Sequence, residues 1–442
     1  MMSNERAIQT EKNSYNKIIR IAILGEEPLG LGSGKHYFPI ILNNYSWKIN
    51  NKIFRFNTEY IYDKDILKGK LNIKNYDVLL VPGGGVGDGE SIVKGFSKLK
   101  KVKKWKEQII NFIKDGGGYV GICGGTALIT ELETKNNNKK NFIEKLYDNS
   151  SFGISCVKSY YKEISMPIFN LNQKNPEKIG AMSYVFSFSP GKTIDGTYIH
   201  SGGVPIDFNI NKDNPIFSDY PKETERIRWW GGPALIVPNN SKRDIKILAK
   251  YPDSDISQHE STRIFAWKYT GGIIGIIKGF YKASKLIKKE KSSLKNLLIY
   301  SFYLAGNWEI TNKIIDLDYN SKPCMTSEIY PNKNKGRILL CTAHPEYMIW
   351  RGGQIIESSY NNFNSLGSGL HKWININNLS RTIENELTHT WWIVRRMVSW
   401  AAKVPDGSFP PIINTEDNKN IEKIISKNIL WDGTLIDQMK NI

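Results

Sequence analysis

Short apolar-rich runs that end in glycine-rich turns are the feature that most constrains the fold of this chain. The run 76–81 ends in Pro82-Gly83-Gly84-Gly85, and the run 119–122 leads into Cys123-Gly124-Gly125. Strands alternating with helices at this spacing indicate βαβ units and a parallel sheet. The predicted strands cover residues 18–24, 52–57, 76–81 and 119–122, and the helices between them cover 36–45, a short stretch near 65, and 94–114.

Beyond residue 135 the pattern is less regular. Short β-like runs broken by Gly and Pro fill 135–335, a strand is predicted at 336–341, and helices are predicted at 284–303 and 381–402. The predicted organisation is a loose tail at 1–17, an α/β domain at 18–350 with β-rich insertions at about 135–335, and a C-terminal helical extension at 351–442 packed on the core.

The net charge and its distribution bear on which partners the chain can bind. The chain has 61 Lys+Arg against 43 Asp+Glu, a formal net charge of +18. Its densest basic run, 98–106, has apolar residues at helical spacing, which predicts an amphipathic helix with a solvated basic face. Since no nucleic-acid motif accompanies the charge and no stretch approaches the roughly 20 apolar residues of a membrane span, we expect neither specific nucleic acid nor a membrane as a partner.

The cysteines and the first residues point to a reducing compartment. Four cysteines, at 123, 156, 324 and 341, include no CxxC pair and have no close His, so neither a disulfide framework nor a zinc site is predicted. The chain starts with polar residues and no apolar signal segment. We therefore expect a cytoplasmic protein without a metal or cofactor.

Cys123 lies in a glycine-rich turn where a predicted strand meets a helix. A sharp turn of this kind presents its side chain at the carboxyl edge of the sheet, as in a nucleophile elbow. The helix N-terminus and a neighbouring imidazole would favour the thiolate, which is the attacking form. The alternative is a buried turn of small residues whose cysteine is inert.

The segment His344-Pro345-Glu346 follows another buried strand. A His with a Glu two residues later supplies a general base and a carboxylate that can fix its tautomer. A lone His can equally be structural. However, ligands of open α/β sheets bind beyond the carboxyl ends of the strands, and both this segment and the Cys123 turn map to that edge.

Together, Pro82-Gly83-Gly84-Gly85, Gly121-Ile122-Cys123-Gly124-Gly125 and His344-Pro345-Glu346 resemble the class I glutamine amidotransferase-like superfamily. Within it, residues 116–123, Trp230-Gly231-Gly232-Pro233 and 336–340 are similar to the biotin-protein ligase N-terminal domain family. The resemblance implies a flavodoxin-like parallel sheet with helices on both faces, here with β-rich insertions and a C-terminal helical extension.

The resemblance also implies roles. Cys123 would be the nucleophile, His344 its base and later acid, and Glu346 the group that orients the imidazole. The backbone N–H groups of Gly84 or Gly85 and of Gly124 would form the oxyanion hole. The implied reaction is the hydrolysis of a carboxamide or related acyl bond through a thioester.

Other residues offer further arrangements. The intracellular protease and chaperone-like branch places a Glu after its first strand, so Glu26 or Glu27 beside Cys123 would imply a different thiol chemistry. His200 and the segment Trp230-Gly231-Gly232 are candidates for the substrate cleft, although a loop-structural His and packing tryptophans are the alternatives.

Two functional hypotheses follow. The first is a Cys-His-Glu hydrolase whose partners are a small-molecule amide or acyl substrate and either a second copy of the chain or a separate synthetase subunit. The second is a non-catalytic ligand-binding or regulatory module that keeps the fold.

Overall fold

The computed structural model describes somewhat more than half of the chain, in nineteen segments. The described residues are 15–25, 37–43, 45–83, 100–133, 140, 144–145, 148, 151–162, 189–192, 198–201, 204–229, 232–254, 265–269, 272–290, 308–314, 317–332, 335–346, 348–350 and 387–412.

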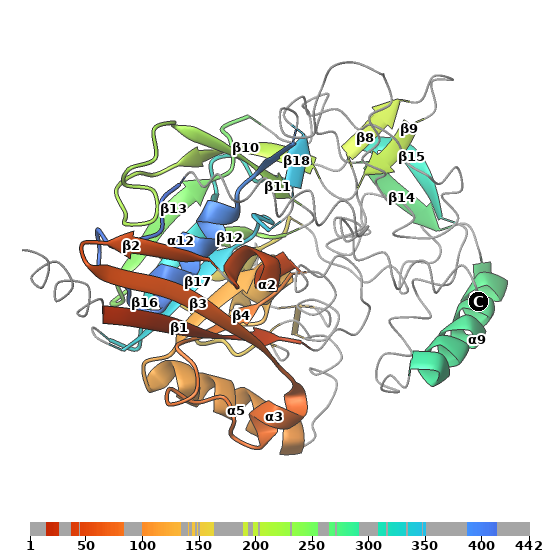
Figure 1. Ribbon diagram of the computed structural model, residues 1–442. Coiled ribbons are helices and arrows are strands. Elements are labelled where there is room, and N and C mark those ends of the chain that lie inside the picture. Colours follow the sequence, from red (N-terminus) through yellow and green to blue (C-terminus); the bar gives the residue numbers. More distant parts are fainter. Residues whose placement is uncertain are drawn as a thin grey trace, which may run out of the picture.

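Five parallel strands form the centre of the molecule (Figure 1). They are β1 (Tyr15–Leu24), β3 (Lys52–Ile61), β4 (Val78–Val81), β5 (Gly118–Ile122) and β17 (Gly336–Cys341). Their spatial order is β3-β1-β4-β5-β17, and every neighbouring pair is parallel. Numbered along the chain, this is the 2-1-3-4-5 order of flavodoxin-like sheets. The predicted fold class is therefore confirmed.

Antiparallel strands extend the sheet on both sides to ten strands. On one edge is β2 (Ser46–Ile49), which forms a hairpin with β3. On the other edge, four strands from the predicted insertion continue the sheet beyond β17, in the order β16 (Pro323–Tyr330), β13 (Ile245–Lys250), β10 (Val204–Ile210) and β11 (Thr224–Trp229). These inserted segments thus widen the core sheet.

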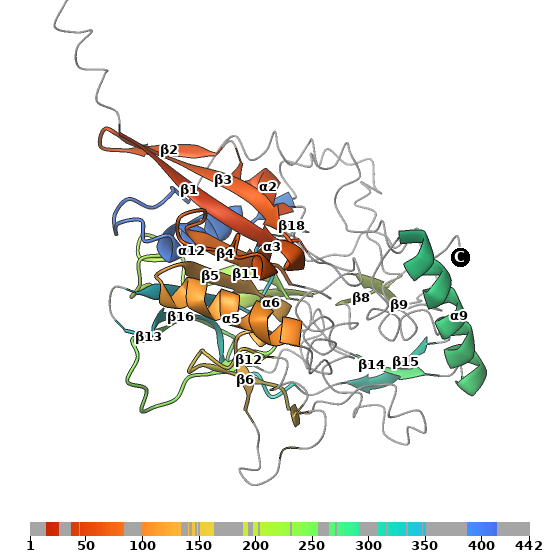
Figure 2. The same cartoon turned by 90° about the horizontal axis from the view of Figure 1, so that it is seen from below.

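Helices cover both faces of the sheet, as Figures 1 and 2 show. Strand residues alternate between two buried clusters: Ile21 and Ile23 belong to one, and Ala22 and Leu24 to the other. This follows from the period of two in a strand that is buried on both faces. The first cluster is completed by α2 (Tyr37–Leu42) and α12 (Trp391–Ala401), and the second by α3 (Asp63–Leu67) and α5 (Lys100–Lys114).

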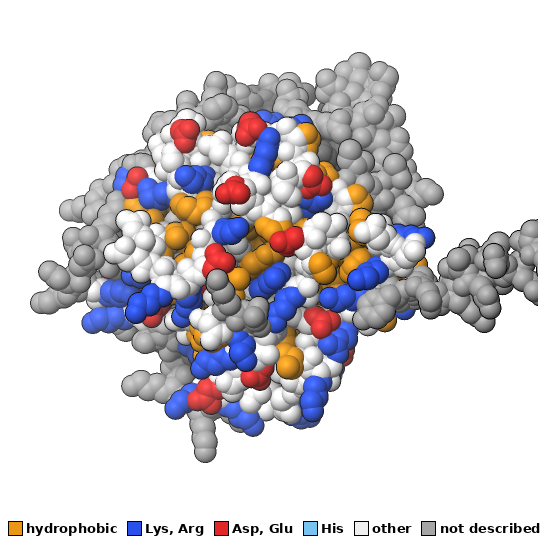
Figure 3. Space-filling view, turned by 90° about the vertical axis from the view of Figure 1, so that its left-hand side faces the viewer, with side chains coloured by type: hydrophobic (Ala, Val, Ile, Leu, Met, Phe, Trp, Pro, Cys, Tyr) orange, Lys and Arg blue, Asp and Glu red, His pale blue; other side chains and the backbone are white. Residues whose placement is uncertain are grey.

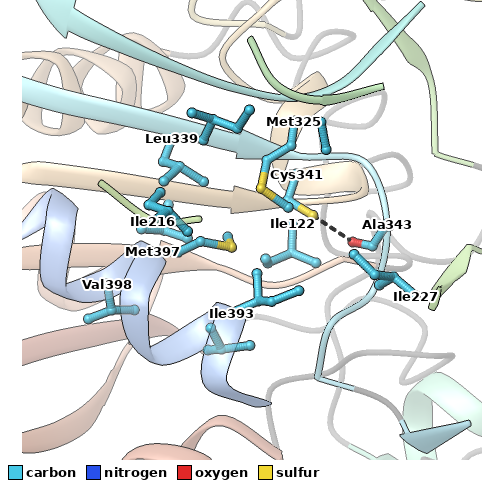
Figure 4. Close-up of a cluster of buried hydrophobic side chains, with 14 of the residues drawn as sticks. Ile122, Ile216, Ile227, Met325, Leu339, Cys341, Ala343, Ile393, Met397 and Val398 are labelled. Carbon is cyan, nitrogen blue, oxygen red and sulfur yellow. Dashed lines mark hydrogen bonds between the residues drawn. The ribbon is translucent and has the colours of Figure 1, made fainter. Parts of the chain in front are cut away.

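The helix α12 is buried at every residue. Its Ile393 and Met397 pack towards Ile122, Leu339 and Cys341 of the sheet (Figure 4). Arg395 donates to the carbonyl of Ile41 at 3.0 Å, which ties α12 to α2. The helix is therefore part of the domain core, fixed against the strands that end at the Cys123 turn and the His344 loop.

Further elements lie outside the ten-stranded sheet. They are the three-stranded sheet of β6 (Glu131–Leu132), β7 (Lys158–Tyr160) and β12 (Ala234–Ile236), the pairs β8 (Ser189–Lys192) with β9 (Tyr198–Ser201), β14 (Phe265–Tyr269) with β15 (Trp308–Ile314) and β18 (Met348–Trp350) with β19 (Leu387–His389), and the helices α6 (Gly124–Ala127) and α9 (Gly272–Glu290).

Two predicted helices have different bounds. The helix expected at 284–303 begins at Gly272; Gly275 and Gly279, both buried, weaken the helical signal of this stretch in the sequence. The helix expected at 381–402 begins only at Trp391, because the preceding residues Leu387–His389 pair with β18 as a strand. Residues 94–99 and 291–303 lie outside the described residues.

The basic helix α5 has the predicted amphipathic character. Trp105, Ile109 and Ile113 are buried, whereas Lys103 and Lys104 are exposed. On the face shown in Figure 3, basic side chains are scattered, with acidic and apolar ones between them. In the described part of the chain, no helix is both long enough and apolar enough to cross a membrane.

Candidate active site

Cys123 occupies a strained turn between β5 and α6. Its φ is 47°, in the left-handed region that residues with a Cβ rarely adopt. Three hydrogen bonds hold the turn: the N–H of Cys123 donates to the carbonyl of Cys341 at 2.7 Å, the hydroxyl of Thr126 donates to the carbonyl of Cys123 at 2.6 Å, and the buried Tyr119 hydroxyl donates to the carbonyl of Gly125 at 2.7 Å. Strain maintained in this way is typical of functional turns.

His344 lies in the loop that follows β17. The backbone N–H of His344 donates to the carbonyl of Arg228, the penultimate residue of β11, at 2.7 Å. Its Nδ1 is 2.8 Å from Oε1 of Glu346, and both side chains are almost completely buried. Glu346 therefore fixes the ring orientation and directs Nε2 away from the carboxylate.

The sheet brings the cysteine and histidine loops together. The strands β5 and β17 are parallel neighbours, so their carboxyl ends lie side by side. Gly83, which follows β4, is packed between the two side chains. A Cβ built on Gly83 would lie 2.6 Å from Cε1 of His344 and 2.7 Å from Cβ of Cys123. Only a glycine at this position leaves room for the two side chains to approach each other.

The charges of these side chains are coupled. Burial disfavours the imidazolium, but the negative charges of Cys123 and Glu346 and the hydrogen bonds to both side chains outweigh it. Together they raise the pKa of His344 to about 10. The imidazole therefore carries its proton at neutral pH, next to the cysteine sulfur.

Two other cysteines lie in a different environment. Cys324 and Cys341 are fully buried on β16 and β17, and burial raises the pKa of both thiols. The thiol of Cys341 donates to the carbonyl of Ala343, as Figure 4 shows. Both therefore remain neutral packing groups, whereas Cys123 is the cysteine coupled to an imidazole.

The structure describes only some of the predicted oxyanion-hole and cleft residues. Gly124 is the first residue of α6 and is buried. Gly232 packs against the histidine loop, where an added Cβ would lie 2.0 Å from the carbonyl oxygen of Thr342. His200 lies in β9 opposite Pro190. Gly84, Gly85, Trp230, Gly231, Glu26, Glu27 and the side chain of His200 lie outside the described residues.

Sequence reasoning missed several residues that shape this site. Gly83 belongs to the glycine-rich motif 82–85, but the motif suggested a functional role only for Gly84 and Gly85. The hydroxyl of Thr390 donates to the carbonyl of Pro345 at 3.0 Å, and the indole N–H of Trp391 donates to the carbonyl of Glu346 at 3.0 Å. The apolar helical pattern around Trp391 indicates only core packing.

A metal site is not seen among the described residues: none of their His, Cys, Asp and Glu side chains gather in threes with ligand geometry.

Comparisons with known proteins found distant structural similarity. No family model and no curated protein sequence matches the chain. Among solved structures, PurLQS from Thermotoga maritima is similar at 12% identity and a TM-score of 0.29, over 79% of this chain and 95% of that one. A glutamine amidotransferase from Thermotoga maritima is similar at 10% identity and a TM-score of 0.24, over 64% and 90%. A ThuA-like protein from Bacteroides uniformis is similar at 11% identity and a TM-score of 0.23, over 55% and 70%.

Proposed function

We propose that the protein is a cysteine-dependent hydrolase of the glutamine amidotransferase-like type, acting on a carboxamide or a related acyl bond. The observation that carries the proposal is the placement of Cys123 and Glu346 around one buried imidazole at the carboxyl edge of a flavodoxin-like sheet. A nucleophile, a proton carrier and an orienting carboxylate are the three groups that acyl transfer through a covalent intermediate requires.

The proposed mechanism starts from the Cys123 thiolate beside the His344 imidazolium, in line with the raised pKa of His344, so the order expected from the resemblance, base and then acid, is reversed. The Cys123 thiolate attacks the acyl carbon, and the His344 imidazolium donates its proton to the departing nitrogen, which leaves as ammonia or an amine. The neutral imidazole then takes a proton from water, and the resulting hydroxide attacks the thioester. Collapse of this second tetrahedral species releases the carboxylic acid and restores the thiolate. His344 thus acts first as acid and then as base.

The oxyanion of each tetrahedral species needs backbone donors. In the proposed mechanism these are the N–H of Gly124, next to the nucleophile, and the N–H of Gly84 or Gly85. Donors aimed at developing charge contribute about 2.7–4 kcal/mol each in comparable hydrolases. The similarity to the biotin-protein ligase N-terminal domain family and the roles of His200, Trp230, Gly231 and Gly232 in substrate binding belong to the same proposal.

The deciding experiment measures ammonia released from a panel of carboxamides that includes glutamine. We expect release by the wild-type protein and its loss in Cys123→Ser and in His344→Ala. The matched control is Cys156→Ser, which removes a half-buried thiol elsewhere and should leave the rate unchanged. Mass spectrometry of the quenched reaction should show the acyl group on the peptide that contains Cys123.

Two results would contradict the proposal. Release of ammonia at the wild-type rate by Cys123→Ser would show that the cysteine is not the nucleophile. No turnover of any amide or ester, together with ordinary alkylation of Cys123, would favour the non-catalytic binding module.

A further inference from the structure

The loop that carries His344 and Glu346 is held from outside its own strand. Glu346 has one described side-chain hydrogen bond, in which Oε1 accepts from Nδ1 of His344, and its buried Oε2 makes none to a described residue. The direction of this carboxylate therefore depends mainly on where the backbone of residues 345–346 is fixed.

Two side chains at the start of α12 fix that backbone. Thr390 Oγ1 donates to the carbonyl of Pro345, and Trp391 Nε1 donates to the carbonyl of Glu346, both at 3.0 Å. Thr390 is 2% exposed and Trp391 is fully buried, so water does not compete for these bonds. The two donors hold successive carbonyls, which restricts both the position and the rotation of the loop at the carboxylate.

The helix α12, which carries both donors, is itself held in place by buried arginine side chains. Arg395 donates to the carbonyl of Ile41, and Arg396 donates to the carbonyl of Ile216 and pairs with Asp219. Groups held on a packed helix position a site more accurately than groups on a loop.

We propose that Thr390 and Trp391 are positioning residues that hold Glu346 against the imidazole of His344 and so keep the Cys123 nucleophile active. This inference rests on the proposed function and deepens it, because it makes α12 a part of the active site. Neither residue needs to touch the substrate; both act through the carbonyls of the loop.

The test measures the alkylation rate of Cys123 by iodoacetamide at pH 6.5 and as a pH profile, with the modified peptide identified by mass spectrometry. Thr390→Val removes the hydroxyl while keeping the shape, and Thr390→Ser restores it. Trp391→Phe removes the N–H and keeps an aromatic ring. The matched control is Trp392→Phe, because Trp392 packs against Phe217 and Tyr220.

We expect Thr390→Val and Trp391→Phe each to slow alkylation about threefold to tenfold, the range set by the net strength of one hydrogen bond. The double variant should approach the rate of Glu346→Gln, whereas Thr390→Ser and Trp392→Phe should match wild type. If the double variant does not fold, as judged by thermal unfolding, the two single variants decide.

The failure of this inference is distinguishable from that of the proposed function. His344→Ala should slow alkylation up to about a hundredfold at pH 6.5, because an ordinary thiol with a pKa near 8.5 is only about 1% ionised there. Wild-type rates in Thr390→Val and Trp391→Phe, with a slow His344→Ala, would overturn the inference alone. Equal slowing in Trp392→Phe would also overturn it, whereas a fast His344→Ala would overturn the proposed function.

Discussion

The two loops that build the candidate active site are held in different ways. The Cys123 turn is shaped mainly by its own residues: glycines on either side, a hydroxyl three residues away, and a phenol on the strand that leads into it. The His344 loop is held by residues distant in the sequence, namely the carbonyl of Arg228 and the side chains of Thr390 and Trp391. The conformation of the Cys123 turn is thus specified largely by nearby residues, whereas the position of His344 depends on the completed fold.

This difference predicts where each loop fails. Changes in the cysteine turn should alter local strain, because most of its partners lie within a few residues and only the carbonyl of Cys341 comes from a distant strand. Changes around the histidine loop should alter proton transfer, because its partners set the geometry of the imidazole.

The largest effect is expected from Glu346→Gln. The neutral amide no longer stabilises the imidazolium or fixes its tautomer, so the rate of amide hydrolysis should fall about 10³-fold. Glu328→Gln is the matched control: Glu328 is equally buried, but it pairs with Arg243 and Ser155 away from the site. That variant should lose about 3 kcal/mol of stability and keep its rate per folded molecule. Equal losses of rate in both variants would show that losing any buried carboxylate lowers the rate, so that the effect does not depend on the contact with His344.

The next effect is on the titration of His344, followed by NMR of the imidazole carbon. Its pKa of about 10 depends on the charge of Cys123 as well as that of Glu346. In Cys123→Ser that charge is lost while burial remains, so the pKa should fall markedly. Because the folded pKa lies above the ordinary value near 6.5, the stability that this proton contributes is complete below pH 6.5 and is lost as pH rises through about 10. An unchanged pKa of His344 in Cys123→Ser would show that the charge of Cys123 does not influence the imidazole.

A third prediction concerns the glycine between the loops. Gly83→Ala places a methyl group within 3 Å of both side chains, so it should displace the imidazole and lower activity about 10²-fold. Gly117→Ala introduces similar crowding, against Phe112 on the other face of the sheet. It should destabilise the fold without changing the rate of the folded molecules. Normal activity in Gly83→Ala would contradict the packing described at this point.

The smallest effect tests the strain in the cysteine turn. At a φ of 47°, Cys123→Gly should be more stable than Cys123→Ala by about 1 kcal/mol in denaturant unfolding. At Cys324, which lies in a strand without a positive φ, the order should reverse by a similar amount. The same order at both positions would mean that the turn stores no strain.

Most of the fold follows from local pattern. The strands β1, β3, β4, β5 and β17 lie where apolar runs predict them, because buried parallel strands leave a strong and simple signal. The hairpin strand β2 was not predicted, since Ser46–Ile49 alternates polar and apolar residues over only four positions. Nor does the sequence reveal that β16 joins the sheet next to β17, because strand pairing across an insertion leaves no local trace.

The residues of the candidate site also differ in whether the sequence indicates their role. Cys123, His344 and Glu346 stand in motifs whose residue types and turns indicate chemistry. Trp391 stands in an ordinary apolar helix pattern, and its N–H donor role depends on a backbone carbonyl of a residue far away in the sequence. Interactions between a side chain and a distant backbone carbonyl place no constraint on the type of the partner residue, so sequence alone does not show them.

The separation of β5 from β17 also affects how the chain matures. The two strands are sheet neighbours, yet about 220 residues lie between Cys123 and His344, and a ribosome adds residues at roughly 5–20 per second. For roughly 10 to 40 seconds the nascent chain therefore exposes its cysteine turn without an imidazole beside it. During that interval the turn lacks the imidazole that the completed sheet places beside it, so the candidate site is assembled only after β17 and α12 have been made.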